Sequence, residues 1–214
     1  MSHSRNLLQA LEEGRLRVES DPEEIHADAA SSVLRAAVSV VVRPAEPAPE
    51  ILLIKRASSD RDPWSGHMAF PGGKYETGDA HLLDTARRET LEETGLVLPE
   101  APPGWVGRLP HVAPRGGGSD QLPRLRVTPF LFRVDAGARA GVASHEVERV
   151  HWVPVPDLAD PAREGIYRMP IGGAVKSFPA IDVVGEQVWG LTWRILDHLM
   201  VGLGLREQGG RAST

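Results

Sequence analysis

The chain has 214 residues, a net charge of −5, 41% hydrophobic and 25% charged residues, and no cysteine. These values are ordinary for a globular protein with a full core, and they exclude a disulfide scaffold, a thiolate zinc site and a cysteine nucleophile. No global positive charge favours nucleic acid, and no apolar run reaches the roughly 18 residues of a membrane span. The first residues lack a signal-peptide pattern, so we expect a cytoplasmic protein with neither a nucleic-acid nor a membrane partner.

The first part of the chain predicts a short helix, a linker and three strands. Leucines spaced among charges at residues 5–16 are typical of an amphipathic helix, and the acidic, Ala/Ser-rich stretch after it is typical of a linker. We assign residues 1–32 to this helix and linker. A Pro-rich turn joins the first two strands and suggests a hairpin. These strands are predicted at 33–44, 50–56 and 67–70.

The part of the chain after residue 100 predicts further strands and a closing helix. Pro129 suggests that its strand lies at an edge or carries a bulge. The Gly-rich stretch at 111–124 is predicted to be a loop. A loop of this length inside a compact domain is more often a functional loop than a simple connection. The strands are predicted at 105–109, 127–134, 147–153, 166–171 and 177–183, and the helix at 188–201.

This order of elements predicts an α+β fold. A mixed β-sheet packed between helices, as an α/β/α sandwich, fits it better than a doubly wound βαβ array. We place the domain at residues 33–203, followed by a flexible tail at 204–214.

The central helix, predicted at 82–94 with Gly95 as its C-terminal cap, carries the chemistry. Glu89, Glu92 and Glu93 are spaced at i, i+3 and i+4, so they share one helix face and repel one another. A divalent cation removes that repulsion and makes an oxygen site suited to Mg²⁺ or Mn²⁺. Just upstream, Gly72 and Gly73 let backbone groups approach a phosphate or metal closely. The pattern favours a metal-dependent phosphoanhydride hydrolase over a solvated acidic helix.

Residues 73–96 resemble the Nudix hydrolase signature, in which a glycine and a mid-motif acid precede Arg-Glu-x-x-Glu-Glu-x-Gly. Here the second half matches without a gap from Arg88 to Leu96. The spacing from Gly73 to Arg88 is one residue longer than usual, and the mid-motif acid is Glu76 or Asp79. The longer spacing, FPGG at 70–73 and WGLT at 189–192 are similar to the coenzyme A diphosphatase branch of the family.

The resemblance implies a site with named roles. Glu89, Glu92 and Glu93 are expected to ligate Mg²⁺ or Mn²⁺, with the Gly73 carbonyl as a backbone ligand, and Arg88 is expected to orient the carboxylates. The general base is a box glutamate or a distal acid, Glu146 or Glu148. Contacts with substrate phosphates are expected from Lys55, Arg56, His67, His111 and Arg115.

The leading interpretation is hydrolysis of coenzyme A or acyl-CoA to adenosine 3′,5′-bisphosphate and 4′-phosphopantetheine. One alternative keeps the chemistry but takes an ADP-sugar, NADH or a dinucleoside polyphosphate. Another, from a different class, is a nucleotide-binding module without activity. The expected partner is a small nucleotide, and whether the chain forms a homodimer stays open.

Overall fold

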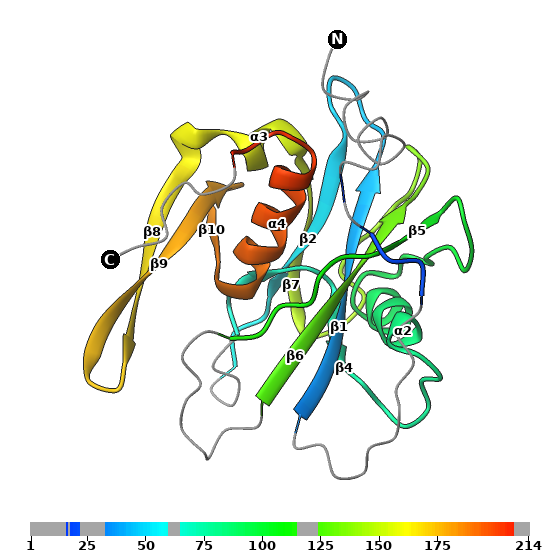
Figure 1. Cartoon of the computed structure of the whole chain (residues 1–214), viewed down its shortest axis with the longest axis horizontal. Coiled ribbons are helices and arrows are strands. Elements are labelled where there is room, and N and C mark those ends of the chain that lie inside the picture. The colour runs from blue at the N-terminus through cyan, green and yellow to red at the C-terminus, as the bar shows by residue number, and fades with distance from the viewer. Residues whose placement is uncertain (1–15, 17, 22–32, 60–64, 115–123, 208–214) are drawn as a thin grey trace.

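The structure is a computed structural model, and it describes residue 16 and residues 18–21, 33–59, 65–114 and 124–207 (Figure 1). Residues 1–15, Arg115 and most of the Gly-rich loop, and the last seven residues lie outside this part, so the predictions for them stay predictions. No helix among the described residues is both long enough and apolar enough to cross a membrane.

Within the described residues, a seven-stranded mixed sheet forms the centre of the fold (Figure 1). Strand β1 (Val33–Arg43) pairs antiparallel with β2 (Glu50–Arg56) and β4 (Gly72–Lys74), and parallel with β6 (Arg124–Arg133). Strand β2 also pairs with β3 (Met68–Ala69) and β7 (Val147–Pro154), and β6 also pairs with β5 (Trp105–Arg108). The nearly continuous Val/Ala run of β1 is mostly buried, as expected of a central strand covered on both faces.

Different layers cover the two faces of this sheet. Helix α2 (Leu82–Thr94) packs on one face against Val41 and Phe130. On the other face lies helix α4 (Gly190–Gly202), together with a three-stranded sheet in the order β10–β9–β8. The strands of this smaller sheet are β8 (Glu164–Ile171), β9 (Ala174–Val183) and β10 (Glu186–Trp189); α3 (Val155–Ala159) and a 3₁₀ turn (Pro161–Arg163) precede them. The predicted α+β sandwich is therefore confirmed.

Helix α2 begins and ends where the sequence predicts. The backbone N–H of His81 donates to Asp84 Oδ2 at 3.1 Å at the start of the helix. Gly95 has a φ of 68° and donates its N–H to the Leu91 carbonyl at 2.8 Å. Only glycine adopts this left-handed conformation without steric cost, so Gly95 fixes the end of the acidic helix.

Three details differ from the sequence prediction. Strand β6 is not at an edge, because β1 and β5 pair with its two sides; Pro129 lies just past the Arg108–Phe130 pair, where β5 has ended. Residues 186–189 form strand β10, whereas the apolar pattern placed the start of the last helix at 188. The predicted single sheet is accompanied by a second one, because in the part of the chain that the structure describes β8, β9 and β10 pair with each other and with no other strand.

Candidate metal-dependent active site

Helix α2 presents the three predicted carboxylates at different depths. The side chain of Glu92 is 58% exposed and that of Glu89 is 17% exposed. Glu93 is buried, with only 4% of the residue exposed. A charged side chain is costly to bury without polar partners, so the position of Glu93 requires a specific hydrogen-bonding environment.

The backbone at the start of β4 provides that environment. The N–H of Gly72 donates to Glu93 Oε2 at 2.9 Å. Gly72 has a φ of 151°, and a Cβ there would lie 2.3 Å from the Ala37 carbonyl oxygen and 2.6 Å from Val38 Cα. Glycine is therefore required at this position by both conformation and space.

Gly73 leaves the space that the next carboxylate occupies. A Cβ on Gly73 would lie 2.2 Å from Glu89 Oε1. The carboxylate of Glu89 therefore lies directly against the backbone of Gly73. Each glycine therefore accommodates one carboxylate: Gly72 donates a hydrogen bond to Glu93, and Gly73 leaves space for Glu89.

Arg88 holds the acidic residues together. Its Nε and Nη2 donate to the two oxygens of Asp79 at 3.0 and 3.1 Å. Its Nη1 lies 3.0 Å from Glu89 Oε1 and 3.5 Å from Glu92 Oε2, and Nη2 also donates to the Lys74 carbonyl at 3.3 Å. One planar guanidinium therefore connects the loop before α2, strand β4 and two carboxylates of the helix.

Asp79, rather than Glu76, is the buried acid that pairs with Arg88. The side chain of Asp79 is 6% exposed, whereas that of Glu76 is 69% exposed and 4.0 Å from Arg88. Asp79 Oδ2 also accepts hydrogen bonds from Thr85 Oγ1 at 2.7 Å and from the backbone N–H of Glu76 at 3.1 Å. The sequence left this choice open, and hydrogen bonding decides it in favour of Asp79 as the partner of Arg88.

The environment of Glu93 links three distant segments. Burial raises the pKa of Glu93 to about 7, although the hydrogen bond from Gly72 opposes the shift. The negative charges of Glu89 and Glu146 raise this pKa further, and the positive charge of Arg56 lowers it. Glu146 and Arg56, which sequence patterns suggested separately, therefore lie within electrostatic reach of Glu93.

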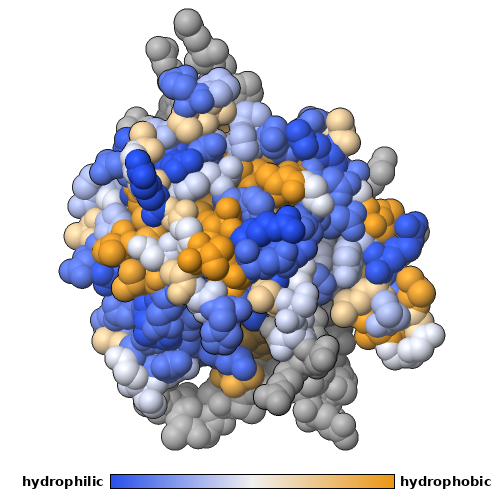
Figure 2. All heavy atoms as spheres, turned by 180° about the vertical axis from the view of Figure 1, so that it is seen from behind, coloured by the Kyte–Doolittle hydropathy of each residue, from blue (hydrophilic) through white to orange (hydrophobic). Residues whose placement is uncertain are grey.

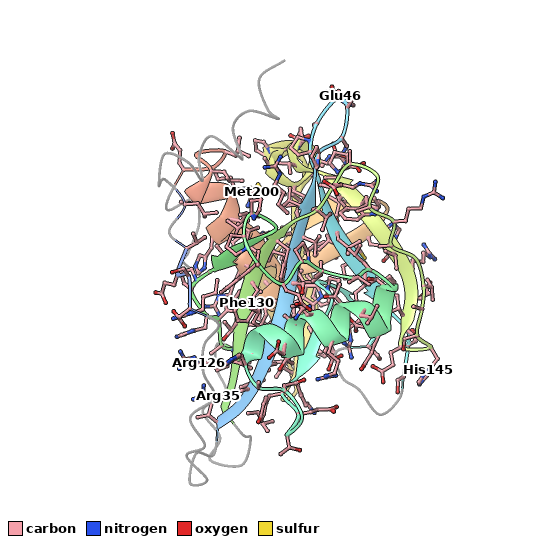
Figure 3. The ribbon with its side chains drawn as sticks, turned by 90° about the vertical axis from the view of Figure 1, so that its right-hand side faces the viewer. Arg35, Glu46, Arg126, Phe130, His145 and Met200 are labelled. Atoms are coloured by element: carbon pink, nitrogen blue, oxygen red, sulfur yellow. The ribbon has the colours of Figure 1, made fainter. Side chains whose placement is uncertain are left out.

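Backbone hydrogen bonds fix the segment that carries Glu146. The N–H of Ala143 donates to the Glu93 carbonyl at 3.1 Å, and the N–H of Ala57 donates to the Glu146 carbonyl at 2.8 Å. Figure 3 labels His145 near one end of α2 and Arg35 near the other. Glu146 is thus tied both to the C-terminal end of α2 and to the residue after Arg56.

The residue types in this cluster fit a hard divalent cation. Every side-chain donor is a carboxylate oxygen, and burial raises the pKa of Glu89 despite the neighbouring Arg88 guanidinium. Crowded carboxylates with raised pKa values are typical of functional sites, and Mg²⁺ and Mn²⁺ prefer such oxygens. Within the described residues the carboxylates serve as acceptors of Arg88 and Gly72, and no three acidic or histidine side chains already converge as ligands. The metal roles therefore stay predictions.

Two of the expected substrate contacts are engaged elsewhere. Lys55 Nζ pairs with Glu186 Oε2 of β10 at 2.5 Å. His67 Nε2 lies 3.1 Å from the Tyr167 hydroxyl, and its ring packs edge-on against Trp189. Both contacts join the main sheet to the smaller one. Sequence patterns gave no sign of them, because the partners are more than 95 residues away.

A basic row lies near the opposite end of α2. His111 Nδ1 is 2.9 Å from Arg126 Nη2, and Arg126 is in parallel register with Arg35 of β1. Figure 3 shows Arg35 and Arg126 close together below the N-terminal end of the helix. The structure thus places His111 beside other basic residues rather than beside the carboxylates, and only strand register brings this row together.

Known proteins resemble the chain in sequence and in fold. A NUDIX domain model matches residues 33–169. NudL, an uncharacterized Nudix hydrolase of Yersinia pestis, is 31% identical over 174 residues, covering 77% of each chain. An uncharacterized Schizosaccharomyces pombe protein is 39% identical over 114 residues, but the match spans only 34% of that protein and 53% of this chain. A MutT/nudix family structure from Enterococcus faecalis has a TM-score of 0.50 at 15% identity, covering 86% of this chain and 64% of that one.

The two glycines predict opposite results for alanine substitutions. Gly73→Ala should leave the melting temperature nearly unchanged, because the flexible Glu89 side chain can move away, but it should weaken Mn²⁺ binding at least tenfold. Gly72→Ala should instead destabilise the fold by several kcal/mol, because its Cβ meets backbone atoms. Calorimetric unfolding and Mn²⁺ titration would measure both effects. Equal losses of stability in the two variants would contradict this assignment.

The buried ion pair predicts the effect of neutralising Asp79. Asp79→Asn should lower the free energy of unfolding by about 1–3 kcal/mol, because it removes the acceptor of two charged hydrogen bonds from Arg88. Urea unfolding in EDTA would measure it. Glu76→Gln is the matched control and should change stability by less than about 0.5 kcal/mol, because the Glu76 side chain is exposed.

The same pair predicts how the Asp79→Asn effect depends on pH. Burial alone would raise the pKa of Asp79, but hydrogen bonds from Arg88, Thr85 and the Glu76 backbone hold it below the ordinary 3.8. Stability from a carboxylate with a lowered folded-state pKa is present above the unfolded-state pKa and is lost as pH falls through the folded-state value. The difference between wild type and Asp79→Asn should therefore be constant near neutrality and shrink below about pH 4. A difference that is unchanged down to about pH 2 would argue against the ionised pair.

Proposed function

Because a NUDIX model covers more than half of the chain, the protein belongs to the Nudix hydrolase family, and we propose that it hydrolyses a diphosphate linkage in a nucleoside-diphosphate compound. The observation that carries this proposal is the acidic face of α2. Its buried member, Glu93, is held by the Gly72 amide, and Glu89 lies over Gly73. This combination places two of the proposed carboxylate ligands against the glycine backbone, and the Gly73 carbonyl is the proposed backbone ligand.

In the proposed mechanism the carboxylates hold Mg²⁺ or Mn²⁺. Glu89, Glu92 and Glu93 supply the side-chain oxygens, and the Gly73 carbonyl supplies a backbone oxygen. A bound divalent cation neutralises phosphate oxygens and lowers the pKa of a water molecule. Arg88 keeps Glu89 and Glu92 oriented, and its own charge is anchored on Asp79. Arg88 is therefore a positioning residue.

Glu146 is the proposed general base. It lies within electrostatic reach of Glu93, and its segment is attached by backbone hydrogen bonds to the residues on either side of the site. An acid at the rim of a carboxylate cluster can accept a proton from water while the other carboxylates remain committed to the cation. Glu148, the other distal candidate, pairs with Arg149 at 3.0 Å, which favours Glu146.

The proposed substrate is coenzyme A or an acyl-CoA, cleaved to adenosine 3′,5′-bisphosphate and 4′-phosphopantetheine. The similarity of residues 70–73 and 189–192 to the coenzyme A diphosphatase branch supports it. Lys55 and Arg56 are the basic residues proposed to bind the additional 3′-phosphate; Lys55 is paired with Glu186, and Arg56 acts electrostatically on Glu93. That engagement of Lys55 favours, as a second candidate, substrates that lack this phosphate: ADP-sugars, NADH or dinucleoside polyphosphates.

A module that binds nucleotide without hydrolysing it is the weaker alternative. Such a module has no need to maintain the acidic site, yet Glu89, Glu92 and Glu93 are all present. Arg88 and the two glycines that accommodate these carboxylates are also in place. The complete set favours catalysis.

Two substitutions separate the metal role from the base role. Glu92→Gln should lower kcat about 10²-fold or more and weaken Mn²⁺ binding, because it removes a proposed ligand. Glu146→Gln should lower kcat about 10²-fold while Mn²⁺ affinity stays near that of wild type. Steady-state kinetics and Mn²⁺ titration would measure the two quantities for each variant.

Glu100→Gln provides the control, because Glu100 is an acid at 82% side-chain exposure that pairs only with Arg87 in the described structure. It should change neither kcat nor Mn²⁺ affinity. Unchanged turnover in Glu92→Gln would remove the acidic face as the metal site. Unchanged turnover in Glu146→Gln would return the base role to a carboxylate of α2.

A substrate panel tests the proposed specificity. With Mg²⁺ or Mn²⁺, kcat/KM for coenzyme A and acetyl-CoA should exceed that for dephospho-CoA, ADP-ribose, NADH and diadenosine tetraphosphate. Dephospho-CoA is the matched control, because it lacks only the 3′-phosphate. Product analysis should identify adenosine 3′,5′-bisphosphate. Faster turnover of ADP-ribose or NADH would reject coenzyme A but retain the hydrolase, and EDTA should abolish every activity.

A further inference from the structure

The β8–β9 hairpin extends away from the main body of the molecule. Figure 1 shows its tip beyond the main sheet and α4, and Figure 2 shows apolar and charged residues together on the corresponding lobe. Ile166, Ile171 and Val175 are 54%, 39% and 69% exposed. Of these three, Ile166 shares a strand face with Glu164 and Arg168.

Strand β8 is the last strand of its sheet. The sheet has the order β10–β9–β8, and within the described residues no other segment pairs with the outer edge of β8. All eight residues of the strand pair with β9 on the inner side. Natural proteins usually protect such long edges with charges, bulges or cover, because an open edge accepts another strand.

The turn determines which backbone groups point outward. Gly172 and Gly173 have φ values of 61° and 81°, as in the type I′ turns that close two-residue hairpins. The residues that flank such a turn, Ile171 and Ala174, face each other as a hydrogen-bonded pair of the ladder. Because the hydrogen-bonding direction alternates along a strand, the even-numbered residues from 164 to 170 direct their backbone groups to the free edge.

The side chains of these outward residues are self-complementary. Glu164, Ile166 and Arg168 are exposed and share one face of β8. A second copy paired antiparallel about Ile166 puts each Glu164 opposite Arg168 of the other copy and places the two Ile166 side chains in contact. A register centred on Glu164 or Arg168 would oppose like charges, and one centred on Gly165 or Tyr167 would leave both charges without a partner across the strand.

We propose that β8 joins two copies of this chain through this antiparallel, two-fold register. Pro170 ends the ladder because it has no backbone N–H to donate at the free edge. On the other face, Gly165 lies opposite Tyr167 of the second copy, whose ring stays stacked on Trp189 of its own chain. The paired strands extend the two small sheets into one continuous six-stranded sheet.

The charged residues are accessible for this pairing. Glu164 Oε1 lies 3.2 Å from Arg206 Nη2 within the chain, but 48% of its side chain is exposed. Arg168 is exposed and makes no ion pair within the described residues. One short strand from each copy forms an interface smaller than the roughly 1,200–2,000 Å² of stable complexes, so the dimer dissociates on dilution.

Sedimentation equilibrium of the full chain, from about 1 μM to about 1 mM, tests the proposal. Wild type should show a monomer–dimer equilibrium in this range. Arg168→Glu should raise the dimer dissociation constant at least tenfold, because symmetry turns two attractive pairs into two repulsive ones. The double variant Glu164→Arg with Arg168→Glu should restore the wild-type constant within about threefold.

Lys176→Glu is the matched control, because it makes the same charge change on β9, opposite Met169 and on the other face of the hairpin. It should leave the dissociation constant unchanged. A wild-type chain that stays monomeric at every concentration would overturn the proposal. A dimer that Arg168→Glu leaves intact, or that the double variant fails to restore while circular dichroism shows it folded, would also overturn it.

Discussion

The acidic site depends on one interaction, the paired hydrogen bonds between Arg88 and Asp79. Three carboxylates on one helix face repel one another, and burial of Glu93 adds a desolvation cost. Arg88 offsets this by giving two nitrogens to Asp79 and a third to Glu89 and Glu92. Asp79 is itself fixed by Thr85 and by the Glu76 backbone. The like charges of the helix can therefore stay together in the folded chain, because Asp79 holds the positively charged guanidinium of Arg88 in place beside them.

The second requirement is a glycine backbone opposite the helix, which lets the carboxylates of Glu89 and Glu93 come close. Strand β1 pairs with Gly72, Gly73 and Lys74. The register of β1 and β4 therefore determines which residues of α2 the two glycines face. Gly72 then meets Glu93, and Gly73 meets Glu89. The smaller sheet packs on the segment that leads into these glycines, because Tyr167 and Trp189 contact His67, five residues before Gly72.

The sequence was most informative where local chemistry determines structure. The limits of α2, the cap at Gly95 and the carboxylate spacing follow from helix periodicity and glycine conformation, and they were predicted correctly. The choice of Asp79 over Glu76 was not predictable, because it depends on which side chain the loop buries. Nor was the engagement of Lys55 by Glu186, since the two residues are 131 positions apart and meet only when the smaller sheet packs against the main sheet. Pro129 suggested an edge, but β6 is internal, and the segment after β5 still pairs there because the N–H of Leu109 donates to the Pro129 carbonyl at 2.8 Å.

The parallel pairing of β1 with β6 has a consequence for how the site comes into existence. Val33 pairs with Arg124, so this ladder closes a loop of about ninety residues that contains α2, both glycines and Asp79. Closing a long loop costs entropy before its contacts repay it, which makes such pairings late events in folding. Isolated α2 has its carboxylates but neither β1 to hold the glycines nor a buried setting for Glu93. The acidic face in its folded setting is therefore a property of the completed domain, and a nascent chain acquires it only after β6 has been synthesised.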